Sequence, residues 1–145
     1  MNEFVEVKTS EMLGVVLNWA TFCAVYIGMR PTINVIESTT KQLFKGAKPI
    51  TFPRAVSLSY SGAYGVEHHW YPSSDWECGG PLISKYQMDF CCERPETIGA
   101  ALCDENGMYI DDRMMFGKTH LIAACRALVA HKLGDTVSVP KELMA

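Results

Sequence analysis

The sequence has no excess of positive charge. Its 13 lysines and arginines stand against 16 aspartates and glutamates, which gives a formal net charge of −3 over 145 residues. Proteins that bind nucleic acid through overall charge are normally basic. We therefore expect no general nucleic-acid binding. A sequence-selective nucleic-acid adaptor would need its lysines and arginines clustered on one surface.

The sequence also lacks the cysteine spacing of metal and redox sites. None of the six cysteines, at positions 23, 78, 91, 92, 103 and 125, forms a C-x-x-C pair, which structural zinc sites and thioredoxin-like proteins use. His68 and His69 would point apart on extended chain, so at most one could bind a metal. Asp75 and Cys78 complete no recognisable ligand set. We expect no metal, no cofactor, and reduced thiols in the cytoplasm.

Long hydrophobic runs are scarce. Residues 12–29 carry no charge for eighteen positions, which is at the lower limit for crossing a bilayer. Gly14, Asn18 and Thr21 interrupt the run, and neither flank has a basic cluster. Acidic residues also occupy the N-terminus, where a secretory signal would be basic. We expect a buried helix here, no membrane contact and a cytoplasmic protein.

Catalytic motifs are incomplete. Phe116-Gly117-Lys118-Thr119 resembles the end of a phosphate-binding loop, but Asp112 stands where that loop needs a glycine. The G-x-S-x-G turn of a serine hydrolase is absent. We assign no catalytic residue. Whether the protein is an enzyme stays open, and a non-catalytic protein is favoured.

The composition of residues 1–145 is typical of one folded domain. Apolar residues make up 48% of the chain and charged residues 20%, which is enough to fill a core of this size. Strand patterns occur at 4–9, 33–36, 50–52, 56–60 and 136–139, and toward the end of 82–92. Two amphipathic helices are predicted: one from a Thr9 or Ser10 cap to Gly28, and one from a Thr119 cap to Gly134.

Asn106-Gly107 predicts a type I′ hairpin turn between residues 100–105 and 108–113. Strands and helices do not alternate as in a doubly wound sheet. The predicted fold class is therefore α+β, with a small, mainly antiparallel sheet and the two amphipathic helices packed against it.

The segment from Trp70 to Gly80 concentrates side chains suited to binding. Trp and Tyr offer large apolar area with a polar group, Ser and Asp cap turns, and glycines permit close backbone approach. The candidate ligand- or partner-binding residues are Trp70, Tyr71, Ser73, Ser74, Asp75, Trp76, Gly79 and Gly80. The alternative is structural: Trp76 would fill the protein's own core, and Asp75 would only hold the turn.

A homodimer is also predicted. The first helix carries Trp19, Phe22 and Tyr26 outside its main apolar stripe. In so small a domain, one chain can hardly cover a helix on all sides. These three residues are therefore the candidate dimer interface.

Several blocks of sequence resemble the NinX-like bacteriophage proteins. They are residues 7–11 with Leu17-Asn18-Trp19-Ala20, Pro72-Ser73-Ser74-Asp75-Trp76 with Gly79-Gly80-Pro81-Leu82-Ile83, and 121–126 with 132–140. They span essentially the whole chain, although Asn18 stands where the resemblance leads us to expect an acid. The resemblance implies a phage or prophage accessory protein in the bacterial cytoplasm, and it carries no activity or catalytic residues.

The leading functional hypothesis is a non-catalytic interaction protein that binds a host or phage protein. The alternative is a small-molecule-binding protein or small enzyme that uses the aromatic segment 70–80.

Overall fold

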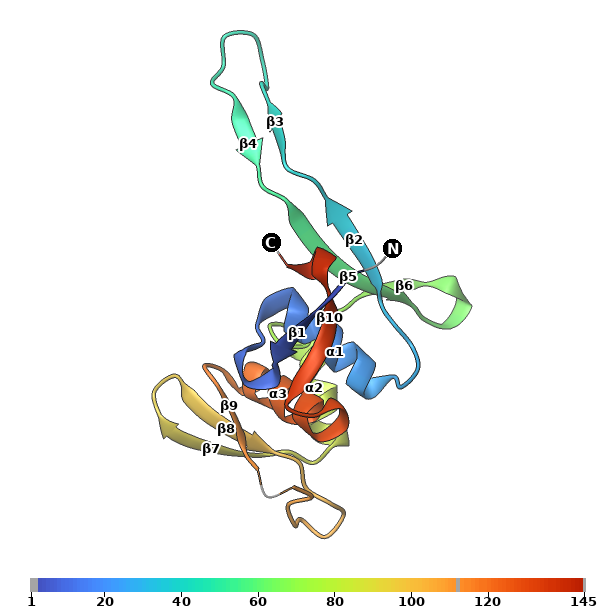
Figure 1. Ribbon diagram of the computed structural model, residues 1–145, viewed down its shortest axis with the longest axis vertical. Coiled ribbons are helices and arrows are strands. Elements are labelled where there is room, and N and C mark those ends of the chain that lie inside the picture. Colours follow the sequence, from blue (N-terminus) through green and yellow to red (C-terminus); the bar gives the residue numbers. More distant parts are fainter. Residues whose placement is uncertain (1–2, 112, 145) are drawn as a thin grey trace.

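The computed structural model describes residues 3–111 and 113–144. Over these residues the chain forms three α-helices and ten strands (Figure 1). The helices are α1 (Gly14–Val25), α2 (Trp76–Lys85) and α3 (His120–Leu133). The strands are β1 (Phe4–Lys8), β2 (Thr32–Ile36), β3 (Thr39–Lys41), β4 (Ile50–Phe52), β5 (Ala55–Ser61), β6 (Glu67–His69), β7 (Asp89–Arg94), β8 (Thr97–Ala101), β9 (Met115–Gly117) and β10 (Thr136–Pro140). The α+β class that the sequence predicts is confirmed.

The strands form four small antiparallel sheets, where the sequence predicts one. β1 pairs with β10, so the two ends of the chain lie together. β2, β5 and β6 form a second sheet, β3 and β4 a third, and β7, β8 and β9 a fourth. The division follows from the helices, which occupy the centre of the molecule, with the sheets arranged around them (Figure 1).

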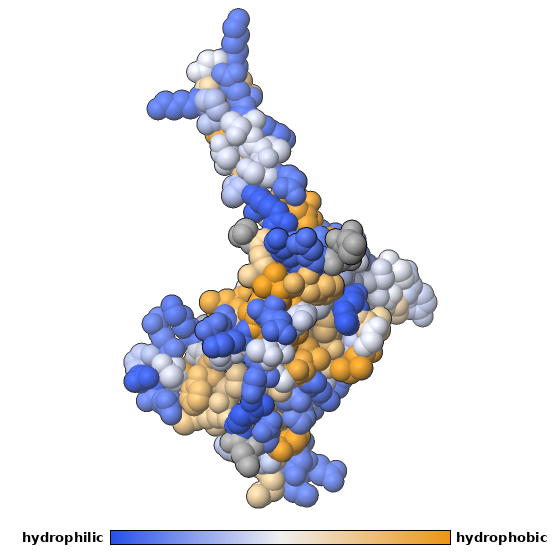
Figure 2. Space-filling view, in the orientation of Figure 1, coloured by the Kyte–Doolittle hydropathy of each residue, from blue (hydrophilic) through white to orange (hydrophobic). Residues whose placement is uncertain are grey.

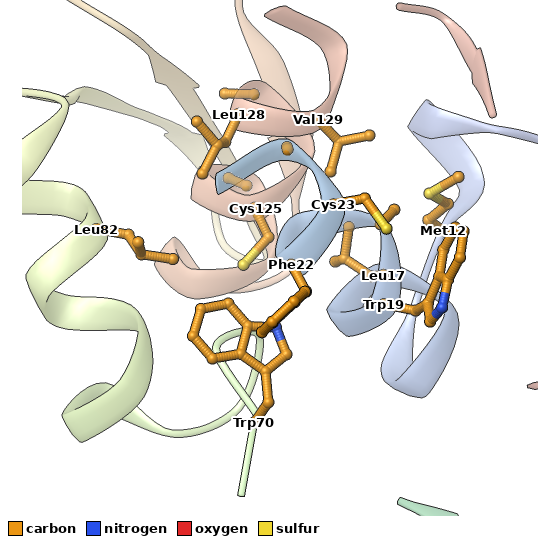
Figure 3. Close-up of a cluster of buried hydrophobic side chains, with 14 of the residues drawn as sticks. Met12, Leu17, Trp19, Phe22, Cys23, Trp70, Leu82, Cys125, Leu128 and Val129 are labelled. Carbon is orange, nitrogen blue, oxygen red and sulfur yellow. The ribbon is translucent and has the colours of Figure 1, made fainter. Parts of the chain in front are cut away.

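Helix α1 lies at the centre of the core. It contacts α3, β5 and β10, and all eight residues from 17 to 24 are buried. Leu17 and Phe22 are almost completely enclosed, together with Leu128 of α3 (Figure 3). The predicted single apolar stripe is therefore wrong for α1, because its own chain surrounds it.

The boundaries of α1 also differ from the prediction. Residues 9–11 form a separate short 3₁₀ turn, and the hydroxyl of Thr9 donates to the carbonyl oxygen of Gly134 over 2.7 Å instead of capping α1. The helix starts at Gly14 without a side-chain cap and ends at Val25. Of the helices in residues 3–111 and 113–144, none is both long and apolar enough to cross a membrane.

Helix α3 forms as predicted. The Oγ1 of Thr119 accepts a hydrogen bond from the amide of Ile122 over 3.1 Å, which satisfies one of the free N–H groups at the helix start. Gly134 ends the helix with a φ of +100°, a conformation that other residues rarely adopt.

Helix α2 is not predicted by the sequence. Gly79, Gly80 and Pro81 lie inside it, and all three lower helix propensity. Asp75 starts the helix, because its Oδ1 accepts from the amide of Glu77 over 3.1 Å. Packing against the rest of the chain therefore outweighs the local preference here.

The turn at Asn106-Gly107 differs from the predicted type I′ turn. Only Gly107 of the pair has a positive φ, +80°. The amide of Gly107 donates to the Asp104 carbonyl, and Asp104 pairs with Met108. The Oδ1 of Asp104 also accepts from the amides of Asn106 and Met108, and this side chain holds the loop in a different shape. Asp112, in the predicted second strand, lies outside the described residues.

A two-stranded ribbon stands away from the rest of the molecule (Figure 1). It continues β2 and β5 outward through β3 and β4 and closes at a turn around Gly46. Every residue from 36 to 53 except Ala47 is exposed. We call residues 37–54 the arm; Figure 2 shows its surface as mostly hydrophilic.

Candidate functional site

The structure divides the predicted segment 70–80 between the core and the surface. Trp70 is only 3% exposed, and Ser73 and Gly79 are also buried. Tyr71 and Gly80 are partly exposed, and Ser74, Asp75 and Trp76 are exposed. The eight candidate residues therefore do not form one surface.

Trp70 holds this segment onto α1. Its Nε1 donates to the carbonyl oxygen of Asn18 over 2.8 Å, and its ring meets that of Phe22 edge-on, with centroids 5.4 Å apart (Figure 3). The Oδ1 of Asn18 accepts from the amide of Ser73 over 3.0 Å. Asn18 thus satisfies two buried donors, and an acid at this position could accept the same bond from Ser73.

Gly79 is required by a close contact. A Cβ at this position would lie 2.3 Å from the carbonyl oxygen of Pro72 and 2.8 Å from Cδ2 of Leu121. Only glycine lets α2 pack this tightly against the segment before it and against α3. At Gly80 a Cβ would meet only the Trp76 ring, at 3.8 Å.

Trp76 does not fill the core. Its side chain, at the start of α2, is 58% exposed, and its nearest aromatic neighbour is His120, at 6.4 Å between ring centroids. His120 in turn lies 5.1 Å from Phe90. The core position belongs to Trp70 instead.

An open groove of about 460 Å³ lies between the β5–β6 strands and the N-terminal part of α2. Its lining residues come from both sides: Tyr60, His68, His69, Tyr71, Asp75, Glu77 and Cys78. Two of the predicted candidates, Tyr71 and Asp75, therefore meet here. We call this feature the groove.

Two aromatic stacks line the groove. Tyr60 and His68 are cross-strand partners of β5 and β6, and their rings stack at 5.3 Å with an angle of 29°. His69 stacks on Tyr71 at 5.8 Å and 12°. The tyrosine ring of each pair presents a π-surface, which attracts cations through its electron-rich face.

The groove carries negative charge. Burial is the main cause that raises the pKa of the Cys78 thiol, and the nearby carboxylates of Asp75 and Glu77 raise it further. Cys78 is therefore protonated at neutral pH and a poor nucleophile. The same field that disfavours a thiolate favours a cation in the groove.

The arrangement offers no assembled nucleophile. Ser73 is buried, with its amide bound to Asn18. In the described part of the chain, neither Ser73 nor Ser74 makes a hydrogen bond to a histidine, as a serine nucleophile requires. Likewise, no group of three or more His, Cys, Asp or Glu side chains within residues 3–111 and 113–144 could hold a metal ion.

The predicted dimer-interface residues lie mostly inside the chain. Trp19 and Phe22 are buried in the core (Figure 3), so they are not free to contact a second copy. Tyr26 is partly exposed and packs against Phe22 at 4.7 Å. The assumption that one chain cannot surround α1 is wrong, and the homodimer itself stays a prediction.

Sequence reasoning missed Tyr60 and Glu77. It considered His68 and His69 as metal ligands, and His69 also as part of a serine-hydrolase triad, and rejected both roles. Tyr60 lies in a predicted strand, but nothing in the sequence pairs that strand with residues 67–69. Glu77 joins Asp75 because α2 begins between them. The unpredicted helix therefore hid this half of the groove.

Comparison with known proteins identifies the family. The family model described as "Bacteriophage P22, NinX" matches residues 8–132. No curated protein matches the chain. The matched region includes α1, α2, all of α3 except its last residue, and the whole groove. Because the match extends over well more than half of its length, the chain belongs to the bacteriophage P22 NinX family.

Proposed function

We propose that this phage-encoded protein is a non-catalytic interaction module of the bacterial cytoplasm, and that its groove binds a lysine or arginine side chain of a partner protein. One observation carries the proposal: four aromatic rings and two carboxylates line the groove, and no lysine or arginine is among the described lining residues.

The tyrosines and carboxylates of the lining favour a cation. Tyr60, stacked on His68, and Tyr71, stacked on His69, supply the π-faces. Asp75 supplies a carboxylate that is exposed and makes no ion pair among the described residues. Cation–π and carboxylate contacts together recognise lysine and arginine better than neutral side chains.

A small-molecule ligand is the second candidate. The groove volume of about 460 Å³ lies within the range of small-ligand pockets, roughly 300–1,000 Å³. Such a ligand would be a small organic cation for the reasons above. Native mass spectrometry of the purified protein would reveal a copurified cation as added mass, whereas binding to a partner protein would leave the purified protein without added mass.

The proposal is tested by NMR titration with N-acetyl-arginine amide, with the uncharged citrulline analogue as the matched ligand. We expect the arginine compound to shift resonances of Tyr60, His68 and Tyr71, and the citrulline compound to leave them unchanged. Asp75→Asn with Glu77→Gln should weaken binding by about tenfold, because removing a charge contact costs roughly 1–2 kcal/mol. Asparagine is an equally good helix cap, so α2 should remain intact.

Glu93→Gln with Glu105→Gln is the control, because it removes two exposed charges away from the groove. This variant should bind as the wild type does. Equal shifts with both ligands, or equal loss in both double variants, would contradict cation recognition in the groove.

A further inference from the structure

The arm carries a charge opposite to that of the rest of the chain. Residues 37–54 have a net charge of +3. They contain one acidic residue, Glu37, and four basic residues: Lys41, Lys45, Lys48 and Arg54. Since the whole chain carries −3, the other residues carry −6. The arm therefore has the cluster of lysines and arginines that a nucleic-acid adaptor requires.

Three of these four basic residues, all except Arg54, are available to bind a ligand. Arg54 lies 3.7 Å from the carboxylate of Glu37 and donates to the carbonyl oxygen of Glu142 near the C-terminus. Within the described residues, Lys41, Lys45 and Lys48 make no ion pair, and all three are exposed. Lys41 lies on β3, while Lys45 and Lys48 lie at the tip, so the charges spread along the ribbon.

The tip combines a fixed turn with exposed apolar side chains. The amide of Ala47 donates to the carbonyl oxygen of Phe44 over 3.0 Å, and Gln42 Nε2 donates to the carbonyl oxygen of Ala47 over 2.9 Å. Leu43 is 64% exposed and Phe44 69% exposed. Apolar side chains presented in this way by DNA-binding proteins can wedge between base pairs.

We propose that the arm binds double-stranded DNA by lying in a groove of the duplex, with its lysines on the phosphates and Leu43 and Phe44 at the bases. A two-stranded β-ribbon fits the major groove of B-form DNA. The eight residues from 38 to 45 extend about 25 Å at roughly 3.3 Å each, so the arm spans several phosphates of each strand. The major groove of A-form RNA is too narrow and deep for such a ribbon.

The surface of the arm favours DNA over an acidic protein as the occupant. Its faces are mixed, because Lys41 lies opposite Ile50 and Thr40 opposite Thr51 in the β3–β4 register. Ile50 and Phe52 share one face of the ribbon with Lys41 and Thr39, so a charged side chain interrupts the apolar area, whereas the core of a stable protein interface is depleted of charge. Evenly repeated phosphates match lysines that follow one another from β3 to the tip of the arm.

The test is fluorescence anisotropy of the full chain with a labelled 30-base-pair duplex over a range of salt concentrations. We expect a Kd of about 10 µM or tighter at 50 mM salt, and a slope of log K against log salt of about −3, from three to four phosphate contacts. Replacing Lys41, Lys45 and Lys48 together by Gln should weaken binding at least about tenfold and remove most of the slope. Leu43→Ser with Phe44→Ser should keep the slope and lower the affinity.

The control replaces Lys8, Lys85 and Lys118 by Gln. These lysines are exposed on the rest of the chain, and the change in net charge is the same. This variant should bind like the wild type, and circular dichroism should show that all variants are folded. Equal weakening in both triple variants, no binding at 100 µM protein, or tighter binding to duplex RNA or single strands would overturn the proposal. The groove double variant retains DNA binding if the two proposals are independent, so failure of either is distinguishable.

Discussion

Trp70 shows how a single buried residue fixes the candidate site. It closes the core against Phe22 and also satisfies its own indole N–H at Asn18. A buried indole without such a partner would cost a desolvation penalty. The groove residues that follow, Tyr71 and Asp75, are held in place because the chain is anchored directly before them.

Replacing the two tryptophans should therefore have different effects on stability. Trp70→Ala should lower the free energy of unfolding by about 3–5 kcal/mol, as for other large buried aromatics. Trp76→Ala should change it by less than about 0.5 kcal/mol, because the side chain is mostly exposed. Urea denaturation measures both values, and a large loss in Trp76→Ala would contradict the assignment.

The six cysteines should differ in reactivity. Burial raises the pKa of Cys23 to about 11 and that of Cys125 to about 12, whereas Cys91 and Cys92 are exposed on β7. Since the thiolate is the reactive form, iodoacetamide at pH 8 should label Cys91 and Cys92 first and Cys23 and Cys125 last. Peptide mass mapping over time gives the order, and early labelling of Cys125 would be inconsistent with this core.

The raised thiol pKa values also determine how the stability of the fold changes at alkaline pH. Between pH 9 and about pH 11, the unfolded chain loses these protons while the folded chain retains them. The unfolded state then binds fewer protons, so the free energy of unfolding falls as pH rises through this window. Below about pH 8 both states retain these protons, so the two thiols add almost no pH dependence to stability.

At the scale of elements, α2 exists because of what it packs against. Its sequence holds two glycines and a proline, which lower its intrinsic helix stability. Gly79 permits the contact with Pro72 and Leu121 that places α2 beside α3. The position of Asp75 and Glu77 in the groove follows from that contact.

The two glycines of α2 should respond differently to alanine. Gly79→Ala should destabilise the protein by about 1–3 kcal/mol, because the new methyl group overlaps the Pro72 carbonyl oxygen. Gly80→Ala should change the free energy of unfolding by less than about 0.5 kcal/mol, because the gain in helix propensity is offset by the contact between a Cβ and the ring of the following Pro81. Thermal unfolding of both variants tests this, and a stable Gly79→Ala protein would show that α2 packs less closely.

At the scale of the whole molecule, the charge is divided between the arm and the rest of the chain. The arm packs little on the remainder and exposes almost all of its side chains (Figures 1 and 2). Two-stranded ribbons of this kind are marginally stable in water on their own. The fold thus presents a cationic ribbon on one side and an acidic, aromatic groove elsewhere.

The predicted homodimer also belongs to this scale. Trp19 and Phe22 are enclosed within one chain, so the surface left for a second copy is Tyr26 with the exposed Ile27 and Met29. We expect light scattering at high micromolar concentration to give twice the mass of the chain, and Ile27→Glu with Met29→Glu to halve it. A mass of one chain for the wild type would exclude the dimer.

Local signals in the sequence were enough to predict several elements. Thr119 and Gly134 delimit α3, and alternating apolar residues mark β1 and β10, because caps and periodicity act within a few residues. The fold class follows from patterns of this kind, whereas the phage family follows from the resemblance of sequence blocks spread along the chain. The short segment 70–80 also proved to contain four of the groove residues, and two of these, Tyr71 and Asp75, are among the predicted candidates.

Only the tertiary structure decided the rest. Helix α2 forms against its local propensity, and the groove joins Tyr60 and His68 to Asp75 and Glu77 through strand pairing and helix packing between distant segments. The net charge sums all residues of the chain. It could not show that a net charge of +3 is concentrated on one projecting ribbon. Burial of α1 likewise depends on three elements, α3, β5 and β10, that come from distant parts of the chain and meet around it, so no single sequence window shows it.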